Sequence, residues 1–313
     1  MEYVKGLVSV VIPTYRRSDM LTRAIDSVLG QTYENVECIV VNDNIVGDEH
    51  SLVLYEKLKV YESDPRFRFL EQEKHINGAA ARNVGIRAAK GEYINFLDDD
   101  DYWELEKLKL QVDWLKAHDE SWGAVGCLSR RLLNGELQIA SLPYRTGNIL
   151  MDILCRRTDL TTGAMLMRRK VLDEAGYFDE SLMRHQDLQL FACLAAKCKI
   201  GLVKKYLYNI EVRDAQNRPD VEKLRMIKEA YFVSIADITD GLTPTQHKRM
   251  MIMHDFECAY AFIHGGKKAD GLKKLFGIFK SPATLFLAAE RVIVRLLGSK
   301  FRRYYNKKYS TVR

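Results

Sequence analysis

Residues 91–103, Gly-Glu-Tyr-Ile-Asn-Phe-Leu-Asp-Asp-Asp-Asp-Tyr-Trp, decide how this chain folds and where its chemistry lies. Tyr93 to Leu97 are mostly apolar and include several β-forming side chains, which predicts a short buried strand. Four aspartates, Asp98 to Asp101, follow that strand without a break. Adjacent carboxylates repel one another, and a hard divalent cation such as Mg²⁺ or Mn²⁺ relieves that repulsion because it prefers oxygen ligands.

The four aspartates also have a purely structural explanation. In a solvated acidic turn, Asp101 would cap a helix and the acids would lie near the positive end of its dipole. The position of the aspartates favours a functional site instead. Ligands of open α/β sheets bind at the carboxyl ends of strands, and these acids begin where a strand ends.

Short apolar runs alternate with segments of helical periodicity through the first two thirds of the chain. The predicted strands are residues 7–12, 36–41, 67–70, 93–97, 123–133 and 163–167. The first predicted helix is capped by Ser18 or Asp19 and ends near Leu29. The other predicted helices are residues 52–61, 77–89, 104–118 and 188–197, and Leu105 lies on the apolar face of the third of these. This alternation predicts an α/β fold with a mostly parallel central sheet and helices on both faces.

The pattern becomes helical from about Asp220, after a polar stretch with a proline at residues 214–219. We therefore expect two parts, an α/β domain over residues 1–215 and a helical C-terminal region over residues 216–313. The six cysteines are scattered without a C-x-x-C pair, which indicates buried, reduced thiols in a cytosolic protein. The N-terminus does not resemble a signal peptide, and no uncharged run is long enough to span a membrane.

Charge is distributed unevenly along the chain. The net charge is +6, but residues 266–313 hold thirteen Lys/Arg and two Asp/Glu, so this segment carries +11 and the remainder −5. In residues 281–313 an apolar face at helical spacing is combined with cations and tyrosines, which predicts a helix lying on an anionic membrane surface. The alternative is a helix packed on the α/β domain. Nucleic acid is the least favoured partner, because no recognised binding module accompanies the charge.

Four motifs in this order resemble those of family 2 glycosyltransferases with the GT-A fold, over roughly residues 7–208. They are VSVVIPTYRR (8–17), IDSVLGQTYENVECIVVND (25–43), AAARNVGIRAAKGEYINFLDDDDYW (79–103) and TGAMLMRRKVLDEAGYFDESLMRHQDLQLFACLA (162–195). The resemblance implies transfer of a sugar from a UDP- or dTDP-linked donor to a hydroxyl of a glycan or lipid-linked acceptor, with inversion at the anomeric carbon. It also implies Mn²⁺ or Mg²⁺ as cofactor, and a role in bacterial cell-surface polysaccharide assembly at the inner face of the cell membrane.

The same resemblance assigns the donor-side residues. Asp98 and Asp100 match the family's D-x-D motif, with Asp100 as the main metal ligand and Asp98 or Asp99 facing the ribose or a metal-bound water. The nucleotide-sugar contacts that it implies are Pro13, Thr14, Tyr15, Asp43, Asn77, Arg82, Asp98 and Asp99. The structural alternative for Asp43 is that it is a turn residue. The structural alternative for Arg82 is that it forms a surface salt bridge.

Asp187, in the pair Gln186-Asp187, matches the position of the family's general base. A base must lie close to the acceptor hydroxyl, on the side of the sugar opposite the leaving phosphate. Its structural alternative is that it caps the helix at 188–197. We expect the neighbouring His185 to be exposed; the alternative is that it tunes the base or binds the acceptor. The chain departs from the family's usual Asp-x-Asp-Leu-Trp-x-Arg pattern at Gln189 and Cys193, which leaves the acceptor-side details open.

Other functions fit the sequence less well. A sugar-nucleotide pyrophosphorylase would need a Gly-rich loop after the first strand, and a dehydrogenase would need G-x-G-x-x-G there; the chain has Pro13-Thr14-Tyr15-Arg16-Arg17. The absence of a Q-x-x-R-W motif disfavours a processive synthase. A catalytically inactive sugar-nucleotide-binding or scaffold protein is the remaining alternative, although Asp98, Asp100 and Asp187 are all present.

Overall fold

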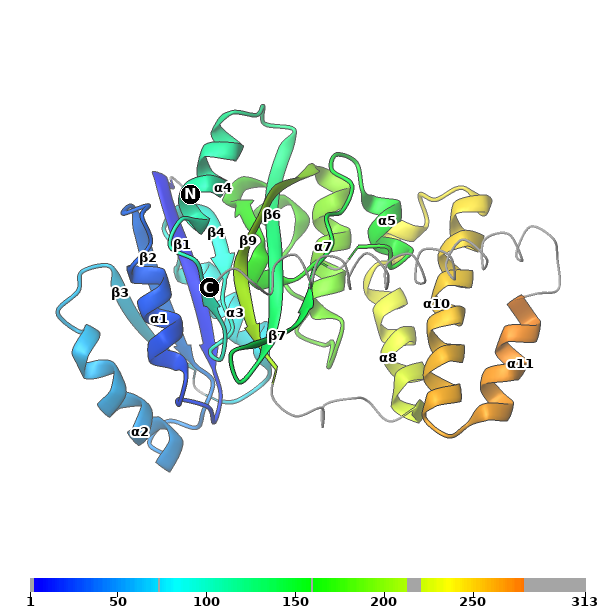
Figure 1. Cartoon of the computed structure of the whole chain (residues 1–313), viewed down its shortest axis with the longest axis horizontal. Helices are drawn as coiled ribbons and strands as arrows, with labels where there is room; N and C mark the ends of the chain where they lie inside the picture. Colours follow the sequence, from blue (N-terminus) through cyan, green and yellow to red (C-terminus); the bar gives the residue numbers. More distant parts are fainter. Residues whose placement is uncertain (1–2, 73, 159, 213–220, 279–313) are drawn as a thin grey trace.

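The computed structural model describes residues 3–72, 74–158, 160–212 and 221–278, which form a nine-stranded mixed sheet with helices on both faces and further helices at one end (Figure 1). The strands are β1 (Val4–Thr14), β2 (Val36–Asn42), β3 (Phe67–Glu71), β4 (Gly91–Phe96), β5 (Tyr102–Trp103), β6 (Trp122–Leu133), β7 (Glu136–Ala140), β8 (Leu166–Arg168) and β9 (Lys199–Glu211). The α-helices are α1 (Leu21–Leu29), α2 (Glu49–Leu58), α3 (Gly78–Ala88), α4 (Lys107–Lys116), α5 (Leu150–Leu154), α6 (Arg169–Ala175), α7 (Gln186–Lys197), α8 (Val221–Ser234), α9 (Ala236–Thr239), α10 (Pro244–His264) and α11 (Lys268–Ile278). Two 3₁₀ turns are η1 (Lys59–Tyr61) and η2 (Thr162–Ala164).

The strands β3, β2, β1 and β4 run parallel to one another, as predicted. β1 lies between β2 and β4 and is buried on both faces, because Val10 and Ile12 pack with α1 whereas Val11 packs in the cluster on the opposite face. The carboxyl ends of these strands share one edge of the sheet, so Thr14 lies opposite Asn42. The loops that follow β1, β2 and β4 therefore meet at that edge.

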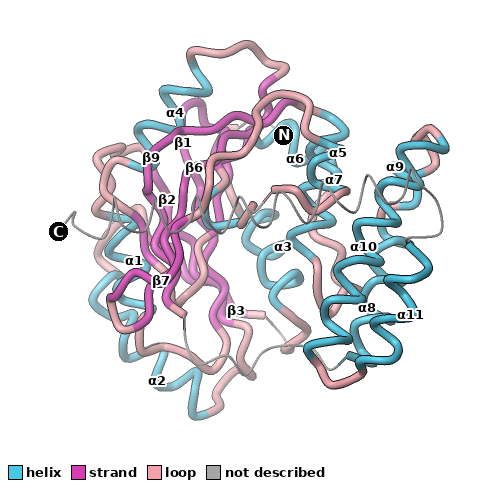
Figure 2. Tube along the Cα trace, turned by 45° about the vertical axis from the view of Figure 1, so that its right-hand side comes forward, coloured by secondary structure: helices cyan, strands magenta, loops and turns pink. Residues whose placement is uncertain are grey.

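The sheet becomes mixed beyond β4. β8 lies antiparallel between β4 and β6, β9 is parallel to β6, and the two-residue β5 is antiparallel to β9, with Tyr102 opposite Asn209. The four aspartates, here called the acid loop (residues 98–101), thus cross from the end of a central strand to the far edge of the sheet. The helices on both faces are clear in Figure 2.

A close approach of α3 to the sheet brings its side chains to the same edge. Gly85 makes this possible, because a Cβ at this position would lie 2.2 Å from Val11 Cγ1. Asn77 begins the helix as predicted, with its side-chain oxygen accepting from the backbone N–H groups of Ala79 and Ala80.

Several local predictions were wrong. Met20 precedes α1 without a side-chain cap, so Ser18 and Asp19 do not cap it; the carbonyl of Ser18 instead accepts from Lys57. The helix expected from residue 104 begins at Lys107, because the chain first joins the sheet through β5, and Leu105 is left 59% exposed. Residues 163–167 are only partly a strand: η2 comes first, and the ring of Tyr208 lies directly over Gly163.

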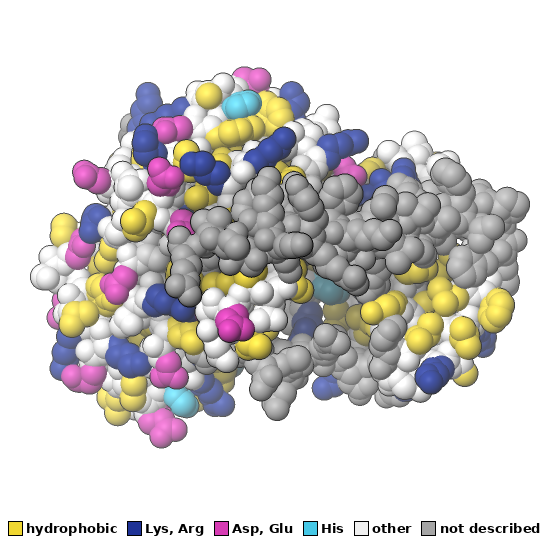
Figure 3. Space-filling view, viewed as in Figure 1, with side chains coloured by type: hydrophobic (Ala, Val, Ile, Leu, Met, Phe, Trp, Pro, Cys, Tyr) yellow, Lys and Arg dark blue, Asp and Glu magenta, His cyan; other side chains and the backbone are white. Residues whose placement is uncertain are grey.

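The C-terminal helices share an apolar core with the α/β part. Tyr231, Ile235, Met250 and Met253 lie in the same buried cluster as the α7 residues facing them, and α8, α10 and α11 lie side by side (Figures 1 and 2). Figure 3 shows hydrophobic side chains gathered on the surface of this helical part. The boundary expected near residue 215 falls in residues 213–220, outside the described part, and stays a prediction. Among the described helices, none has the length and apolarity needed to cross a bilayer.

A network of polar contacts connects α8 and α10 to α5. His254 Nε2 donates to the carbonyl oxygen of Leu154 (2.9 Å), and its Nδ1 accepts from Lys228 Nζ (2.9 Å). Lys228 Nζ also contacts Glu257 Oε2 at 2.5 Å, and Glu257 lies 3.6 Å from Arg156 Nε. These partners require neutral His254, and burial together with the charge of Lys228 lowers its pKa to about 3.

We expect Lys228→Met to destabilise the protein by about 3 kcal/mol, because removal of the buried ammonium leaves the partly buried Glu257 with only the more distant Arg156 and leaves His254 Nδ1 without a donor. The matched control is Arg225→Met, one turn earlier on α8, where an exposed guanidinium pairs with Glu229 at 2.8 Å. An exposed pair contributes about 0.5 kcal/mol. Urea unfolding of both variants measures the difference, and equal midpoints would contradict the anchoring role of Lys228.

Candidate active site

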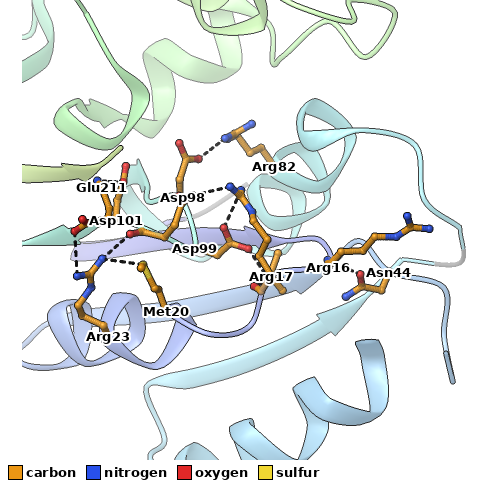
Figure 4. Close-up of polar contacts among 12 residues, drawn as sticks. Arg16, Arg17, Met20, Arg23, Asn44, Arg82, Asp98, Asp99, Asp101 and Glu211 are labelled. Atoms are coloured by element: carbon orange, nitrogen blue, oxygen red, sulfur yellow. Dashed lines mark hydrogen bonds and ion pairs between the residues drawn. The ribbon is translucent and has the colours of Figure 1, made fainter. Parts of the chain in front are cut away.

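The four carboxylates of the acid loop lie in different surroundings, and Figure 4 labels three of them, Asp98, Asp99 and Asp101. Asp98 Oδ1 lies 2.5 Å from Arg82 Nη2, and Asp100 Oδ2 lies 2.6 Å from Arg17 Nη1. Asp99 and Asp101 point into the protein, and each is only 2% exposed. Buried and less buried carboxylates thus alternate along the acid loop. Asp98 and Asp100 lie toward the edge of the sheet, whereas Asp99 and Asp101 hold the loop in place.

Asp99 fastens the acid loop to the end of β1. Its Oδ2 accepts from Thr14 Oγ1 at 2.8 Å, and its Oδ1 lies 3.0 Å from Arg17 Nη2. Burial raises the pKa of Asp99 to about 7, although the Arg17 charge acts in the opposite direction. The predicted contacts of Asp99 and Thr14 with a donor would have to form beside these internal bonds.

Asp101 fastens the other end of the acid loop to β9. It accepts from the Tyr208 hydroxyl and, at 3.0 Å, from the backbone N–H of Glu211. Burial and then the neighbouring Asp98 raise the pKa of Asp101 to about 8. Asp101 therefore links strands and does not cap a helix, which excludes the structural alternative considered for the acidic run.

A second group of residues lies beside the carboxyl ends of β1 and β2. Asp43 is buried, and its carboxylate accepts from Gln72 Nε2 (2.7 Å) and lies 3.0 Å from His75 Nδ1. The ring of Tyr15 stacks on that of His75 with centroids 3.9 Å apart. Burial raises the pKa of Asp43, opposed by His75. The sequence predicted Tyr15 and Asp43 but missed Gln72 and His75, which follow β3 without a motif of their own.

Pro13, Thr14 and Tyr15 come together as the end of β1 and the loop after it. A small pocket of about 180 Å³ adjoins this loop and is lined by Thr14, Arg16, Arg17, Ser18, Asp19, Asn44, His50, Val53 and Leu54. Arg16 has left-handed backbone (φ 53°), and its N–H donates to Asn44 Oδ1 at 2.7 Å. The loop thus presents Arg17 to the acid loop, whereas the Arg16 side chain lies over the ring of Tyr15 and points away from the aspartates (Figure 4).

The helix α3 faces the acid loop through Arg82, whose ion pair with Asp98 corresponds to the salt-bridge alternative; its predicted contact with the nucleotide stays a prediction. Asn77, by contrast, uses both polar atoms of its side chain internally: its oxygen caps α3, and its Nδ2 donates to the carbonyl of Glu180 at 2.8 Å. Asn83, which the sequence did not single out, exchanges hydrogen bonds with the backbone of Phe178. These contacts hold the segment before α7 against α3.

Asp187 is the second residue of α7, and its Oδ1 accepts from the backbone N–H of Leu188 at 2.8 Å. Burial raises the pKa of Asp187, whereas the charges of Arg156 and Arg82 lower it. Arg82, which binds Asp98, is among the charges that act on the predicted base. The same helix, α3, binds the segment before α7 through Asn77 and Asn83, so it contacts both the acid loop and the segment that leads to Asp187.

The neighbourhood of Asp187 differs from expectation at His185. The histidine was expected to be exposed, but its Nε2 is buried and its backbone is left-handed (φ 66°) at the N-cap of α7. Burial, then Lys228 and Arg156, lower the pKa of His185 to about 3. At the two positions that depart from the family pattern, Gln189 Nε2 lies 3.3 Å from Cys193 Sγ. The contact between these two side chains is therefore neutral, whereas the resemblance implies an acid and an arginine at the same positions.

The donor chemistry at the sheet edge suits a divalent cation, which would compete with Arg82 and Arg17 for the carboxylates of Asp98 and Asp100. Asp98 and Asp100 offer oxygen donors, and the described residues contain no group of three or more His, Cys, Asp or Glu side chains able to hold a metal alone. Mg²⁺ and Mn²⁺ sites of nucleotide enzymes commonly use one or two carboxylates together with substrate phosphates. The residues present therefore suit a cation that binds with a nucleotide diphosphate.

Comparison with known proteins gives the class of this fold and site. Residues 9–176, just over half of the chain, match the family "Glycosyl transferase family 2". TarS from S. aureus in complex with UDP-GlcNAc superposes with a TM-score of 0.65 at 19% identity, over 87% of this chain and 79% of that one. The mannosyltransferase PcManGT from Pyrobaculum calidifontis, in complex with GDP-Man and Mn²⁺, superposes with a TM-score of 0.58 at 17% identity, over 97% of this chain and 88% of that one.

The chain belongs to glycosyltransferase family 2, with a GT-A-like α/β fold followed by C-terminal helices. The UDP-Glc:alpha-D-GlcNAc-diphosphoundecaprenol beta-1,3-glucosyltransferase WfaP of Escherichia coli is 34% identical over 110 residues, which are 35% of this chain and 41% of WfaP. The chain spans about a third of the length of the first curated relatives that it matches, uncharacterized glycosyltransferases of Rickettsia.

Proposed function

We propose that the protein is an inverting, metal-dependent glycosyltransferase that moves a sugar from a UDP- or dTDP-linked donor to a hydroxyl of a glycan or lipid-linked acceptor. The observation that carries the proposal is that α3 binds Asp98 of the acid loop through Arg82 and, through Asn77 and Asn83, the segment that leads to Asp187. A donor diphosphate at the acid loop would thus lie beside a carboxylate suited to accept a proton. The name of WfaP supports a lipid-linked acceptor, and the relatives named for teichuronic acid and colanic acid biosynthesis support a role in cell-surface polysaccharide synthesis.

The donor side is formed by the loops after β1, β2 and β4. Asp43 would accept a hydrogen bond from the nucleotide base, with the stacked rings of Tyr15 and His75 beside it. Arg17 and Arg82 carry positive charge to the place proposed for the phosphates. Asp98 and Asp100 would hold Mn²⁺ or Mg²⁺, which would neutralise charge on the diphosphate and make it a better leaving group.

The acceptor side is formed by Asp187. Its carboxylate takes the proton of the acceptor hydroxyl while that oxygen bonds to the anomeric carbon of the sugar. The bond between this carbon and the phosphate oxygen breaks, and the nucleoside diphosphate leaves with the electron pair. Holding both substrates at one edge of the sheet makes this step effectively unimolecular.

The proposal is tested with a panel of UDP-, dTDP- and GDP-sugars, Mn²⁺, and acceptors that include lipid diphosphate sugars, with product detection by mass spectrometry. We expect one UDP- or dTDP-sugar to yield an inverted glycoside. Tight nucleotide-sugar binding without transfer to any acceptor or to water would instead support the inactive, scaffold alternative.

We also propose, from the sequence alone, that the basic segment at residues 281–313 brings the enzyme to an anionic membrane surface, where a lipid-linked acceptor is available. This segment lies outside the described residues. The expected result is that the full chain sediments with anionic liposomes at low salt whereas a chain ending at Lys280 does not. Equal, low sedimentation of both proteins would overturn the membrane role.

A further inference from the structure

Two buried polar atoms without a partner meet where the C-terminal helices touch the helix that carries Asp187. They are His185 Nε2 and the Tyr231 hydroxyl. The two rings pack edge to face, with centroids 5.8 Å apart and planes at 80°, and Tyr231 is completely buried on α8. Most buried polar groups in folded proteins are hydrogen-bonded, because a lost partner costs stability. The presence of two such groups at one contact points to a partner gained during function.

The backbone is strained at the same place. In the part of the chain that the structure describes, four residues other than glycine have positive φ: Arg16, Asn134, Arg156 and His185. Asn134 lies in the tight turn between β6 and β7, where this conformation is ordinary. Arg156 ends α5 in the left-handed conformation that is common at helix C-termini, with the N–H of Arg157 donating to the carbonyl of Asp152. His185, at the start of α7, has no such explanation. Strain of this kind persists only where the surroundings impose it, and it collects at functional sites.

Charge connects these groups to Asp187. The carboxylate of Asp187 is among the charges that raise the pKa of Tyr231, after burial, and Arg156 acts on the pKa of both residues. Asp187 lies only two residues after His185, and its Oδ1 accepts from Leu188 at the start of the helix. The imidazole of His185 therefore packs on the ring that carries the Tyr231 hydroxyl, and Asp187 follows His185 by two residues at the start of α7.

We propose that Tyr231 is a positioning residue for Asp187: its hydroxyl donates to the Asp187 carboxylate when the acceptor binds and turns that carboxylate toward the acceptor hydroxyl. His185 holds the Tyr231 ring and sets the direction in which α7 starts. The contacts of Lys228 and His254 with Glu257 and Leu154 hold α8 in place for this role. The inference rests on the proposed function of Asp187, and it makes the C-terminal helices, beyond the residues that match the family, part of the active site.

The test compares Tyr231→Phe with Tyr61→Phe in the full chain. Tyr61 is a buried tyrosine on η1 whose hydroxyl does have a partner, Asp26 Oδ1 at 2.7 Å. We expect Tyr231→Phe to lower kcat for transfer about 10-fold, the range of one hydrogen bond to a charged group, with donor KM unchanged and a melting temperature equal to or above that of the wild type. The acidic limb of kcat should move to higher pH, since the lost hydrogen bond favoured the ionised carboxylate. Tyr61→Phe should do the reverse: a lower melting temperature with normal kcat.

A second variant, His185→Asn, removes the ring and keeps a residue that tolerates left-handed backbone. It should also reduce kcat without lowering the melting temperature. Wild-type kcat and pH profile in Tyr231→Phe would overturn the proposal, as would a loss of kcat that only accompanies a loss of stability. If Asp187→Asn transfers normally, the assignment of the base fails and this inference fails with it. An inactive Asp187→Asn beside a normal Tyr231→Phe overturns the positioning role alone.

Discussion

Asp187→Asn is expected to bind the donor normally and to lose transfer by about 10²–10⁴-fold, because the acceptor proton then has no base to receive it. The substitution preserves the shape of the side chain and the hydrogen bond from the Leu188 N–H, which an amide oxygen accepts as well. Structural damage is therefore small. The measurement is single-turnover transfer together with calorimetry of nucleotide binding, and the control is Asp113→Asn, an exposed carboxylate on α4 paired with Lys109.

The pH dependence gives an independent check of the same residue. A base works in its ionised form, so activity falls as the pH drops through its pKa. Burial raises the pKa of Asp187, while Arg156 and Arg82 oppose that change. The acidic limb of the kcat profile should therefore lie above the value of about 3.9 for an ordinary aspartate. Near-normal turnover of Asp187→Asn on the natural acceptor would remove Asp187 from the mechanism.

The sequence predicts best the strands whose pattern of apolar residues directly reflects their position in the sheet. β1, β2 and β4 are continuous apolar runs because both of their faces are buried, and the residues that follow them fall at one edge of the sheet by the geometry of parallel strands. The proximity of Thr14, Asp43 and the acid loop therefore follows from the order of strands and loops along the chain. Asn77 as the N-cap of α3 follows from local chemistry alone.

The parts that escaped prediction depend on contacts between distant residues. β9 is interrupted by Lys204 and Lys205, so it lacks an uninterrupted apolar run, and it is a strand because of its pairing with β6. β5 has only two residues and exists because β9 lies beside it. His185 was expected to be exposed, since nothing near it in the sequence indicates that Tyr231, on a helix 46 positions further along the chain, covers its ring.

Asp100→Asn is expected to abolish the increase in UDP affinity that Mn²⁺ produces. Asp100 is the acid-loop carboxylate that matches the second aspartate of D-x-D, and an amide is a far poorer ligand than a carboxylate for a hard cation. Loss of a ligand should lower metal affinity by at least about 10-fold, because substitution of a residue that only hydrogen-bonds to a metal ligand already has an effect of that size. Calorimetry of UDP binding with and without Mn²⁺ measures the effect, and Asp19→Asn, an exposed carboxylate in the loop after β1 that pairs with Lys57, is the control.

The contact between Asp100 and Arg17 makes this prediction specific. Arg17 Nη1 lies 2.6 Å from Asp100, and its other terminal nitrogen lies 3.0 Å from Asp99. When Asp100 becomes neutral, one negative charge beside Arg17 disappears, so the guanidinium should attract the UDP diphosphate more strongly. Metal-free affinity for UDP should therefore stay the same or rise while the response to Mn²⁺ disappears. A variant that merely disturbs the loop would lose affinity under both conditions, and a variant with an unchanged response to Mn²⁺ would show that Asp100 does not bind the metal.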